Sequence, residues 1–510
     1  MRNIHFRCLG KADRKFESPT KLVYYAYSPN FLNLRKILKS MGRSRSQTPQ
    51  VYHNLEITDL ASEGMGIARH EGMVVFVEQA VTGDVVDVQI TRKKSGFRQG
   101  KVIHFHQRSA LRVEPKCEHF GICGGCKWQV ISYADQLKHK AKQVKDALTR
   151  IAKVPLPEIA PIHGSATEYY YRNKLEYTFS ASRWLTEEEI GSKDEFSDRA
   201  ALGFHIPGRF DKVLKINNCY LQPDPSNAMR LFVEKRAKEL GISFFNLMEQ
   251  TGVMRNLLLR NNSKGEWMVC LSVTDALPEV FTLLDDLKAA FPQIHALLYT
   301  INTKRNDTIS DLDIFVHSGA GFIEEEMEGL RFRIGPKSFY QTNSEQAYEL
   351  YKHTRAFAGI TKDDVVYDLY TGTGTIALFV AGLAKKVVGV EYVPEAVADA
   401  KINAEVNGVE NVSFFAGDMK DVLVEGFFET HGKPDVIITD PPRAGMHDDV
   451  TKRLIESGAR RIVYVSCNPA TQARDLILLD QAYTVVAVQP VDMFPQTTHV
   501  ENIVVLDRKN

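Results

Sequence analysis

The C-terminal part of the chain alternates short apolar runs with amphipathic segments, and this alternation constrains the fold more than any other feature. Strands are predicted over residues 364–370, 385–392, 412–418, 435–443, 460–468, 483–493 and 499–508. Helices are predicted over residues 374–384, 394–408, 448–459 and 470–479. Alternating strands and helices form a doubly wound parallel sheet, and two final strands without a helix between them form an antiparallel hairpin at its edge. We therefore predict an α/β, Rossmann-like domain.

A glycine-rich turn follows the first of these strands. In "DLYTGTGTIAL", Gly372, Gly374 and Ala377 form a G-x-G-x-x-A pattern, in which backbone N–H groups can approach a ligand. Glu391 ends the second strand, where a carboxylate accepts hydrogen bonds from ribose hydroxyls. Asp418 ends the third predicted strand and is placed to reach an adenine edge. The motif alone fits NAD as well as S-adenosylmethionine.

The turn "TDPPRAG" after the fourth strand favours the methyl donor. Asp440-Pro441-Pro442 fixes a rigid, non-helical turn at the carboxyl edge of the sheet, where ligands of such sheets bind. Asp440 is therefore expected to face the cleft beside S-adenosylmethionine. A turn that merely precedes a helix is the alternative. Dehydrogenases require no such turn, and the antiparallel ending of the sheet is characteristic of methyltransferases.

Cys467 lies at the carboxyl end of the fifth strand, in "VYVSCNPAT". A cysteine in an apolar stretch is more often a core residue than a nucleophile. Here Pro469 stops the strand and exposes the side chains before it at the sheet edge. A free thiol, a few per cent ionised at pH 7, can add to C6 of a pyrimidine, so that C5 attacks a methyl sulfonium. Glu501, at the head of the last strand, is the carboxylate available to remove the C5 proton.

The net charge of +1 conceals an uneven distribution. Residues 1–50 carry eleven Lys/Arg against two Asp/Glu, and residues 92–153 carry fifteen against four. A basic N-terminal part beside an acidic remainder predicts a polyanion-binding surface joined to an enzyme, with solvated helix faces as the alternative.

The longest apolar run has nine residues, so no membrane span is expected. A cytoplasmic monomer without an obligate protein partner is predicted.

Over residues 51–108, short runs of alternating apolar and polar residues are separated by glycine turns, and this pattern predicts a small five-strand, OB-like barrel. The stretch resembles a TRAM RNA-binding domain. Its basic loop from Arg92 to Arg98 is expected to contact phosphates. A helix is predicted from Tyr133 to Ala152, and Cys270 is predicted to be a core residue.

Four regions follow from these patterns. Residues 1–48 form a basic extension, which is expected to be disordered. Alternatively, the functional protein starts at Met41, so that the residues before it are not part of it. Residues 49–109 form the barrel, residues 110–335 a mixed α+β central domain, and residues 336–510 the methyltransferase domain.

The stretch "CEHFGICGGC" provides three cysteines in a C-x5-C-x2-C pattern, and a fourth cysteine follows in "INNCYLQ". These candidate ligands are Cys117, Cys123, Cys126 and Cys219. Four thiolates can hold zinc or a [4Fe–4S] cluster, and the spacing alone does not choose between them.

The stretches "DLYTGTGT", "TDPPRAGMH", "YVSCNPATQARDL" and "DMFPQTTHVENIVVL" together resemble the RNA uracil-C5 methyltransferases. The resemblance implies that Cys467 is the nucleophile and Glu501 the proton acceptor. It also implies an S-adenosylmethionine site that includes Gln341, Tyr370, Glu391 and Asp440. Cytosine-C5 enzymes are less similar, because they carry a cysteine where this chain has Arg443.

The cysteine pattern is similar to that of the iron–sulfur members of this family, which implies a [4Fe–4S] cluster. Members with both a barrel and a cluster resemble the enzyme that methylates uridine 1939 of 23S rRNA. The function implied is S-adenosylmethionine-dependent methylation of uridine C5 in 23S rRNA through a covalent adduct between cysteine and C6. The alternatives are a tRNA uridine-C5 methyltransferase and a non-catalytic, RNA-binding iron–sulfur assembly protein.

Overall fold

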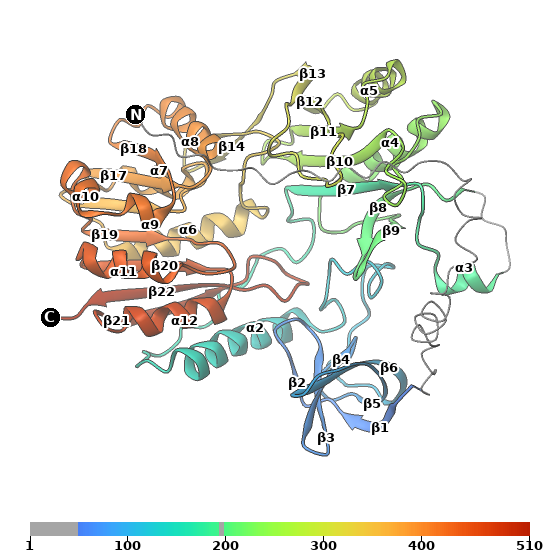
Figure 1. Cartoon of the computed structure of the whole chain (residues 1–510), viewed down its shortest axis with the longest axis horizontal. Coiled ribbons are helices and arrows are strands. Elements are labelled where there is room, and N and C mark those ends of the chain that lie inside the picture. Colours follow the sequence, from blue (N-terminus) through green and yellow to red (C-terminus); the bar gives the residue numbers. More distant parts are fainter. Residues whose placement is uncertain (1–48, 193–197) are drawn as a thin grey trace, which may run out of the picture. The chain divides into compact units, whose positions relative to one another are not determined.

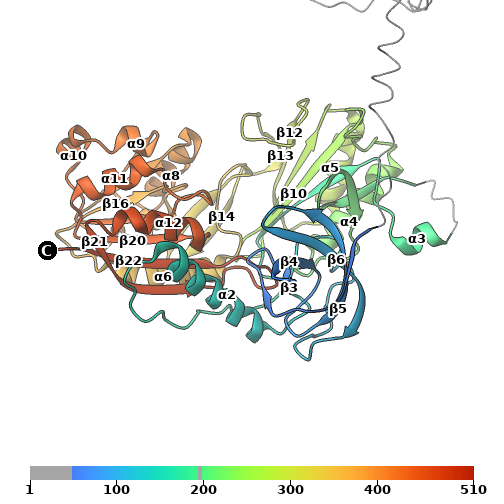
Figure 2. The same ribbon diagram turned by 60° about the horizontal axis from the view of Figure 1, so that its bottom comes forward.

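The C-terminal domain is built on a seven-stranded sheet with helices on both faces (Figures 1 and 2). The computed structural model describes residues 49–192 and 198–510, so the basic extension and Met41 lie outside the described residues. The strands are β16 (Val365–Leu369), β17 (Lys386–Glu391), β18 (Val412–Ala416), β19 (Val436–Thr439), β20 (Arg461–Ser466), β21 (Tyr483–Val491) and β22 (Glu501–Arg508). Their order is β18-β17-β16-β19-β20-β22-β21.

The strand directions confirm the predicted topology. The five strands β16 to β20 pair in parallel. Strand β22 runs antiparallel to both of its neighbours, β20 and β21, and β21 forms the edge. The helices of the domain are α6 (Ser344–Ala358), α7 (Thr375–Ala381), α8 (Pro394–Val406), α9 (Met419–Val422), α10 (Glu425–His431), α11 (Asp448–Ser457) and α12 (Pro469–Leu479).

Both faces of this sheet are buried, because successive strand residues point to opposite sides and both sets are apolar. Val366 and Ile438 pack in a cluster with residues of α6, α7 and α8. Tyr367, Ile437 and Ile462 belong to a second cluster with residues of α11 and α12. The carboxyl edge of the parallel strands is therefore held rigidly from both sides.

The central part of the chain, predicted to be mixed α+β, contains a second seven-stranded sheet, of mixed direction. Its strands are β7 (Lys174–Ser180), β8 (Ala201–Ile206), β9 (Arg209–Lys215), β10 (Met254–Asn261), β11 (Trp267–Val273), β12 (Ile294–Ile301) and β13 (Phe315–Gly319), in the order β13-β12-β11-β10-β7-β8-β9. The remaining elements are α3 (Glu187–Gly191), α4 (Ser226–Glu239), α5 (Pro278–Ala290) and the hairpin β14 (Ile323–Met327) and β15 (Leu330–Ile334). Cys270 is 3% exposed and lies in a hydrophobic core, as expected.

The N-terminal sheet has six strands, one more than predicted. These are β1 (Val51–Glu56), β2 (Asp59–Leu60), β3 (Gly66–His70), β4 (Met73–Glu78), β5 (Val85–Lys93) and β6 (Phe97–Gln107), in the order β1-β5-β6-β4-β3-β2. The additional strand β2 has only two residues, too few to show an alternation of apolar and polar residues. A small core with Leu55, Val75 and Val86 holds the sheet together.

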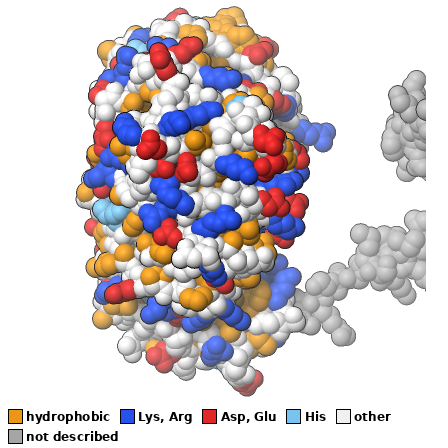
Figure 3. All heavy atoms as spheres, turned by 90° about the vertical axis from the view of Figure 1, so that its left-hand side faces the viewer, with side chains coloured by type: hydrophobic (Ala, Val, Ile, Leu, Met, Phe, Trp, Pro, Cys, Tyr) orange, Lys and Arg blue, Asp and Glu red, His pale blue; other side chains and the backbone are white. Residues whose placement is uncertain are grey.

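Helix α2 (Tyr133–Ala147) continues into a π-turn over Leu148–Ala152, so the predicted helical segment is confirmed over its whole length. Lys138 and Lys142 of this helix explain part of the basic stretch as a solvated helix face. Lys138 pairs with Asp135 at 2.8 Å, and Lys142 pairs with Asp146 at 2.6 Å. Figure 3 likewise shows Lys and Arg interspersed with Asp and Glu on the face that it displays. Across the described ranges, no helix has the length and apolar character to cross a membrane.

Candidate active site

A cavity of about 970 Å³ opens at the carboxyl ends of the parallel strands of the C-terminal sheet. Ligands of open α/β sheets bind at this edge. The structure brings all the predicted catalytic and donor-site residues together in its lining: Gln341, Tyr370, Glu391, Asp418, Asp440, Cys467 and Glu501.

Strand order places the three reactive groups next to each other. Strand β20 lies between β19 and β22. Cys467 follows β20, Asp440 follows β19, and Glu501 is the first residue of β22. The thiol therefore lies between two carboxyl groups, each supplied by a neighbouring strand.

Burial and the two carboxylates change the acidity of the thiol. Burial is the largest cause, and the charges of Glu501 and Asp440 add to it, so that the pKa of Cys467 rises to about 11, although Arg443 opposes the shift. The expectation of a thiol that is a few per cent ionised at pH 7 is therefore wrong for the ligand-free cleft. The sequence could not show this, because the carboxyl groups come from other strands.

The two carboxyls are themselves difficult to ionise. Glu501 is only 5% exposed. Burial, together with the charge of Asp440, raises the pKa of Glu501 to about 8. Burial raises the pKa of Asp440 to about 7. Buried carboxyls with pKa values raised toward neutrality are typical of a site for acid–base chemistry.

The Asn-Pro pair after Cys467 begins a helix as well as ending the strand. Asn468 is the N-cap of α12 and accepts from the backbone N–H of Ala470 at 3.2 Å, and Pro469 occupies the first turn. The Asn468 amide also donates to the carbonyl oxygen of Arg443 at 3.0 Å. This bond ties the Asp-Pro-Pro-Arg turn to the segment that carries the thiol.

The glycine-rich turn has the geometry of a ligand-binding loop. Gly372 and Gly374 have φ of 56° and 80°, values that favour glycine. A Cβ on Gly374 would lie 2.8 Å from the ring of Phe414, whereas a Cβ on Gly372 would meet nothing within 4 Å. The loop thus packs against the sheet at Gly374 and faces the open cleft at Gly372. The Glu391 carboxylate accepts from the backbone N–H of Gly372 at 3.1 Å.

Asp418 lies in the cleft, but it does not end a strand as predicted. Strand β18 ends at Ala416, and Asp418 is the N-cap of the short helix α9. Its carboxylate accepts from the backbone N–H of Lys420 and pairs with the Lys420 ammonium at 2.7 Å. An aspartate at an N-cap accepts hydrogen bonds from the free N–H groups of the first helical turn. Asp418 therefore starts helix α9, and the strand ends before it.

The loop before Glu501 is fixed by helix α2. Lys140 Nζ lies 2.6 Å from Asp492 Oδ1, and both side chains are fully buried. The Gln136 amide donates to Gln496 Oε1 at 2.9 Å and accepts from the Gln496 backbone N–H at 2.8 Å. These contacts join residues more than 350 positions apart in the chain. They hold the segment that leads into β22 and therefore position Glu501.

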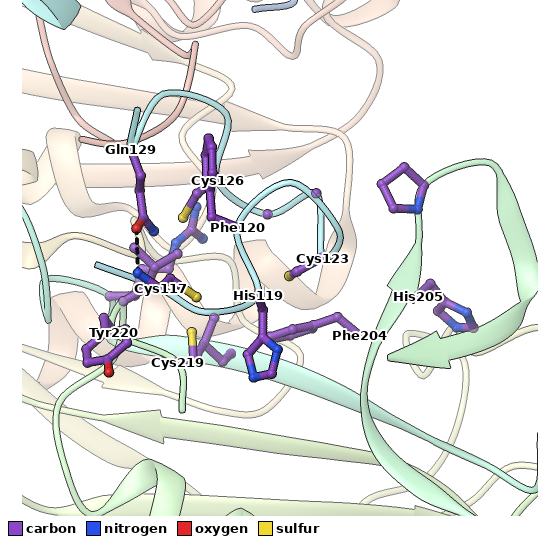
Figure 4. Close-up of a pocket in the computed structure, with 16 residues that line it drawn as sticks. Cys117, His119, Phe120, Cys123, Cys126, Gln129, Phe204, His205, Cys219 and Tyr220 are labelled. Carbon is purple, nitrogen blue, oxygen red and sulfur yellow. Dashed lines mark hydrogen bonds between the residues drawn. The ribbon is translucent and has the colours of Figure 1, made fainter. Parts of the chain in front are cut away.

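The four candidate cluster cysteines line a second cavity of about 440 Å³ (Figure 4). The lining thiols belong to Cys117, Cys123, Cys126 and Cys219. Three come from one loop, and the fourth follows β9. Burial raises the pKa of all four, to about 11 for Cys123 and about 12 for Cys126. Neighbouring cysteines add to the shift of Cys123, Cys126 and Cys219, and the charge of Glu118 adds to that of Cys117.

These thiols face one cavity without closing around a single ion. Among the residues that the structure describes, no group of three or more His, Cys, Asp or Glu is arranged to hold a metal ion. A mononuclear zinc site needs four sulfurs about 2.3 Å from one point. Four cysteine sulfurs around one cavity are the donor set by which an iron–sulfur cluster is held.

Comparisons with known proteins agree with this geometry. The family model "tRNA (Uracil-5-)-methyltransferase" matches residues 322–509, and the TRAM domain model matches residues 52–103. A protein of Bacteroides thetaiotaomicron named "Uncharacterized RNA methyltransferase" is 57% identical over 452 residues, which cover 88% of this chain and all of the relative. The chain belongs to the RNA uracil-5 methyltransferase family.

Other relatives of this RNA methyltransferase span nearly the same length. A Porphyromonas gingivalis protein, also named "Uncharacterized RNA methyltransferase", is 54% identical over 462 residues, 89% of this chain and 99% of the relative. Among solved structures, the Pyrococcus abyssi tRNA (uracil-54, C5)-methyltransferase in complex with S-adenosyl-L-homocysteine matches with a TM-score of 0.68 at 26% identity. The match covers 88% of this chain and 99% of that structure. The predictions of the family, the α/β methyltransferase fold and the TRAM domain are confirmed.

The cleft of this methyltransferase also contains groups that were not predicted as site residues. Arg443 contacts the ring of His499, with Nη2 3.2 Å from Nε2. Burial and the charge of Arg443 lower the pKa of His499 to about 4, so the ring is neutral. Asp368 is buried beneath the glycine-rich turn and accepts from Thr371 Oγ1 and from the backbone N–H of Ala377. Their signals were present in the sequence: Arg443 follows Asp-Pro-Pro, and Asp368 precedes the glycines.

Proposed function

We propose that this enzyme transfers the methyl group of S-adenosylmethionine to C5 of a uridine in RNA, with Cys467 as the nucleophile and Glu501 as the base. The observation that carries the proposal is the position of the Cys467 thiol between two buried carboxyls in the cleft that also holds the glycine-rich turn. A thiol, a proton acceptor and a donor loop in one cavity are the groups that methylation of a pyrimidine carbon requires.

The chemistry follows from the weak nucleophilicity of uracil C5. The Cys467 thiol first loses its proton to solvent. Addition of the resulting thiolate to C6 forms an S–C6 bond and moves the C5–C6 electron pair to C5. C5 then attacks the methyl group of the sulfonium. Glu501 accepts the C5 proton, the C5–C6 double bond forms again, and the S–C6 bond breaks to release the thiolate. Atoms and charge balance, because the sulfonium becomes a neutral thioether and one proton leaves the uracil.

The remaining cleft residues fit the donor. Glu391 at the end of β17 is the acceptor for ribose hydroxyls, and Asp418 is the acceptor for an adenine amino group. Gln341 and Tyr370 complete the lining on the donor side, and Asp440 lies between donor and thiol. The solved structural relative, a complex with S-adenosyl-L-homocysteine, supports this choice of donor.

We propose 23S rRNA as the substrate, at a uridine of the 1939 type, which places the enzyme in the cytoplasm. The support is the combination of a TRAM domain with the four-cysteine cavity. A tRNA uridine is the second candidate, because the matching family model and the Pyrococcus abyssi structure are both named for tRNA methyltransferases. A role as a non-catalytic assembly protein has no support, because the reactive groups of the cleft are all in place.

We further propose that the cysteine cavity holds a [4Fe–4S] cluster ligated by Cys117, Cys123, Cys126 and Cys219. When bound, the cluster would join the cysteine loop to the segment after β9. Methyl transfer from a sulfonium needs no electron, so the cluster has a structural role in this proposal.

The substrate is tested with total RNA from a strain that lacks this gene. The protein is incubated with this RNA and with S-adenosylmethionine that is labelled in its methyl group, and the labelled nucleoside is mapped. We expect 5-methyluridine in 23S rRNA. Label confined to tRNA would support the second candidate and contradict the ribosomal assignment.

A further inference from the structure

A cluster of three tyrosines surrounds one lysine beside the cysteine cavity. The ammonium of Lys116 lies 4.8 Å from the ring centroids of Tyr169 and Tyr170 and 5.0 Å from that of Tyr220. The rings of Tyr170 and Tyr220 meet edge to face, 6.1 Å apart. Three cation–π contacts to one ammonium hold the four side chains as a unit. We refer to these four residues as the tyrosine–lysine cluster.

Two members of the cluster, Tyr170 and Lys116, are exposed, and Tyr169 and Tyr220 are half-buried. The Tyr170 side chain is 42% exposed. Tyr170 also has a positive φ of 59°, an uncommon and costly conformation for a residue with a side chain. Its backbone N–H donates to the Tyr220 carbonyl at 2.8 Å, which helps to hold that conformation. The backbone is thus constrained in a form that presents the ring of Tyr170 to solvent.

Lys116 keeps its charge available for an external anion. In the ranges 49–192 and 198–510, no carboxylate pairs with its ammonium. The acidic neighbour of the tyrosines in the sequence, Glu168, accepts from the Gln496 side chain at 3.3 Å. An ammonium without a carboxylate partner beside an exposed aromatic ring matches the needs of a nucleotide, which presents a flat base and a phosphate.

One residue, Arg172, links the tyrosine–lysine cluster to the active site. Arg172, two residues after Tyr170, lines both the catalytic cavity and the cysteine cavity. Its guanidinium lies 5.2 Å from the ring centroid of Phe494, which also lines the catalytic cavity. Tyr220 lines the cysteine cavity, and in Figure 4 its ring points away from the cysteine sulfurs. Arg172 therefore links the segment that carries Tyr170 to the catalytic cleft.

We propose that the tyrosine–lysine cluster binds an unstacked nucleotide of the substrate RNA that flanks the target uridine, with the base stacked on Tyr170 and its phosphate against Lys116. The inference rests on the proposed function, since it is RNA bound in the catalytic cleft that brings a flanking nucleotide here. RNA loops whose bases are splayed out are commonly recognised by stacking on aromatic side chains. A protein partner would also use an exposed tyrosine, but the link to the catalytic cleft through Arg172 and the unpaired ammonium favour RNA.

The test compares two variants of Tyr170 in the full chain. A fluorescein-labelled, single-stranded 12-nucleotide oligouridylate serves as the probe, and its dissociation constant is measured by anisotropy. Tyr170→Leu removes the aromatic face and is expected to weaken binding about 5- to 100-fold. Tyr170→Phe keeps the aromatic face and the positive φ, and its dissociation constant is expected to lie within about twofold of the wild-type value. Equal affinity of the leucine variant and the wild type would overturn the proposal, and so would an equal loss in both variants.

The role of Lys116 is tested by salt dependence. Loss of one phosphate contact lowers the slope of log K against log salt by about 0.7 for a single strand. Lys116→Ala should show this change, with iron content measured in the same sample because Cys117 is adjacent. An unchanged slope would contradict the phosphate contact.

A separate assay of methyl transfer to total RNA distinguishes a failure of the cluster proposal from a failure of the proposed function. If the wild type methylates RNA and the Tyr170→Leu variant binds the oligouridylate as tightly as the wild type, only the proposal for the tyrosine–lysine cluster is contradicted. Absence of methylation and of any covalent adduct in the wild type would remove the proposed function, whatever the oligonucleotide binding shows.

Discussion

The proposed nucleophile, Cys467, lies in an environment that disfavours its ionisation. Burial and two carboxyl groups hold the pKa of the thiol at about 11, and Arg443 is the group that favours the thiolate. A protonated thiol is protected from indiscriminate alkylation and oxidation. In the proposed reaction the thiol must therefore lose its proton before it attacks C6.

Replacement of the base separates the two halves of the reaction. Glu501→Gln keeps the shape of the side chain but cannot accept the C5 proton. We expect the methylated adduct to form and then to persist, because the S–C6 bond breaks only after the C5 proton has left. A covalent protein–RNA band in a denaturing gel is the readout, and turnover should fall about 10²- to 10⁴-fold. Normal turnover in this variant would exclude Glu501 as the base.

The pH profile follows from the same raised pKa values. The base form of Glu501 becomes the major form above about pH 8, and the thiolate of Cys467 becomes the major form above about pH 11. Both active forms are the deprotonated ones, so kcat/KM should rise with pH from about 6 to about 9, more steeply below about pH 8 than above it. Glu501→Asp should retain an increase, whereas a flat or falling profile in the wild type would contradict these assignments.

At the scale of elements, the site depends on contacts between segments that are far apart in the sequence. Helix α2 fixes the loop before β22 through the Lys140–Asp492 ion pair and the Gln136–Gln496 pair. The sheet itself was predictable, because its apolar periodicity and its glycine and proline turns are local signals. Helix α10, with seven residues, is too short for such a signal, and no local pattern predicts that a lysine in a helix pairs with an aspartate 352 positions later.

The buried ion pair gives a stability prediction. Lys140→Met leaves the Asp492 carboxylate without a counter-charge in the protein interior, and should lower the free energy of unfolding by about 3–5 kcal/mol. The double variant Lys140→Met, Asp492→Asn removes that charge and keeps an acceptor for the Tyr133 hydroxyl, which donates to Asp492 at 2.9 Å. It should recover much of the loss in a denaturant titration. A double variant as unstable as the single one would show that packing, and not charge, sets the cost.

At the scale of the whole molecule, the cysteine cavity joins segments that the sequence separates. Cys219 lies 93 positions after Cys126, and only the fold places both in one cavity. The four residues could be nominated from spacing and family resemblance. The choice between zinc and an iron–sulfur cluster could not be made from the spacing, because thiolates bind both.

The proposed cluster has a direct chemical signature. Protein purified without oxygen should contain about four iron and four sulfide per chain and absorb visible light. Cys219→Ser should lose the iron and lower the thermal unfolding midpoint, whereas Cys270→Ser, in the core away from the cavity, should retain the iron. Colourless protein with one zinc per chain would contradict the assignment.

The central claim is that the sulfur of Cys467 forms the bond to uracil C6. RNA in which uridine is replaced by 5-fluorouridine tests it most directly, because a base cannot remove the fluorine from C5 as it removes a proton, so that the S–C6 bond does not break and the adduct is trapped. Wild-type protein incubated with this RNA and S-adenosylmethionine should yield a covalent complex, with the mass of the modified nucleotide on the peptide that contains Cys467, and Cys467→Ala should yield none. A complex that still forms with Cys467→Ala, or that maps to another residue, would contradict the account.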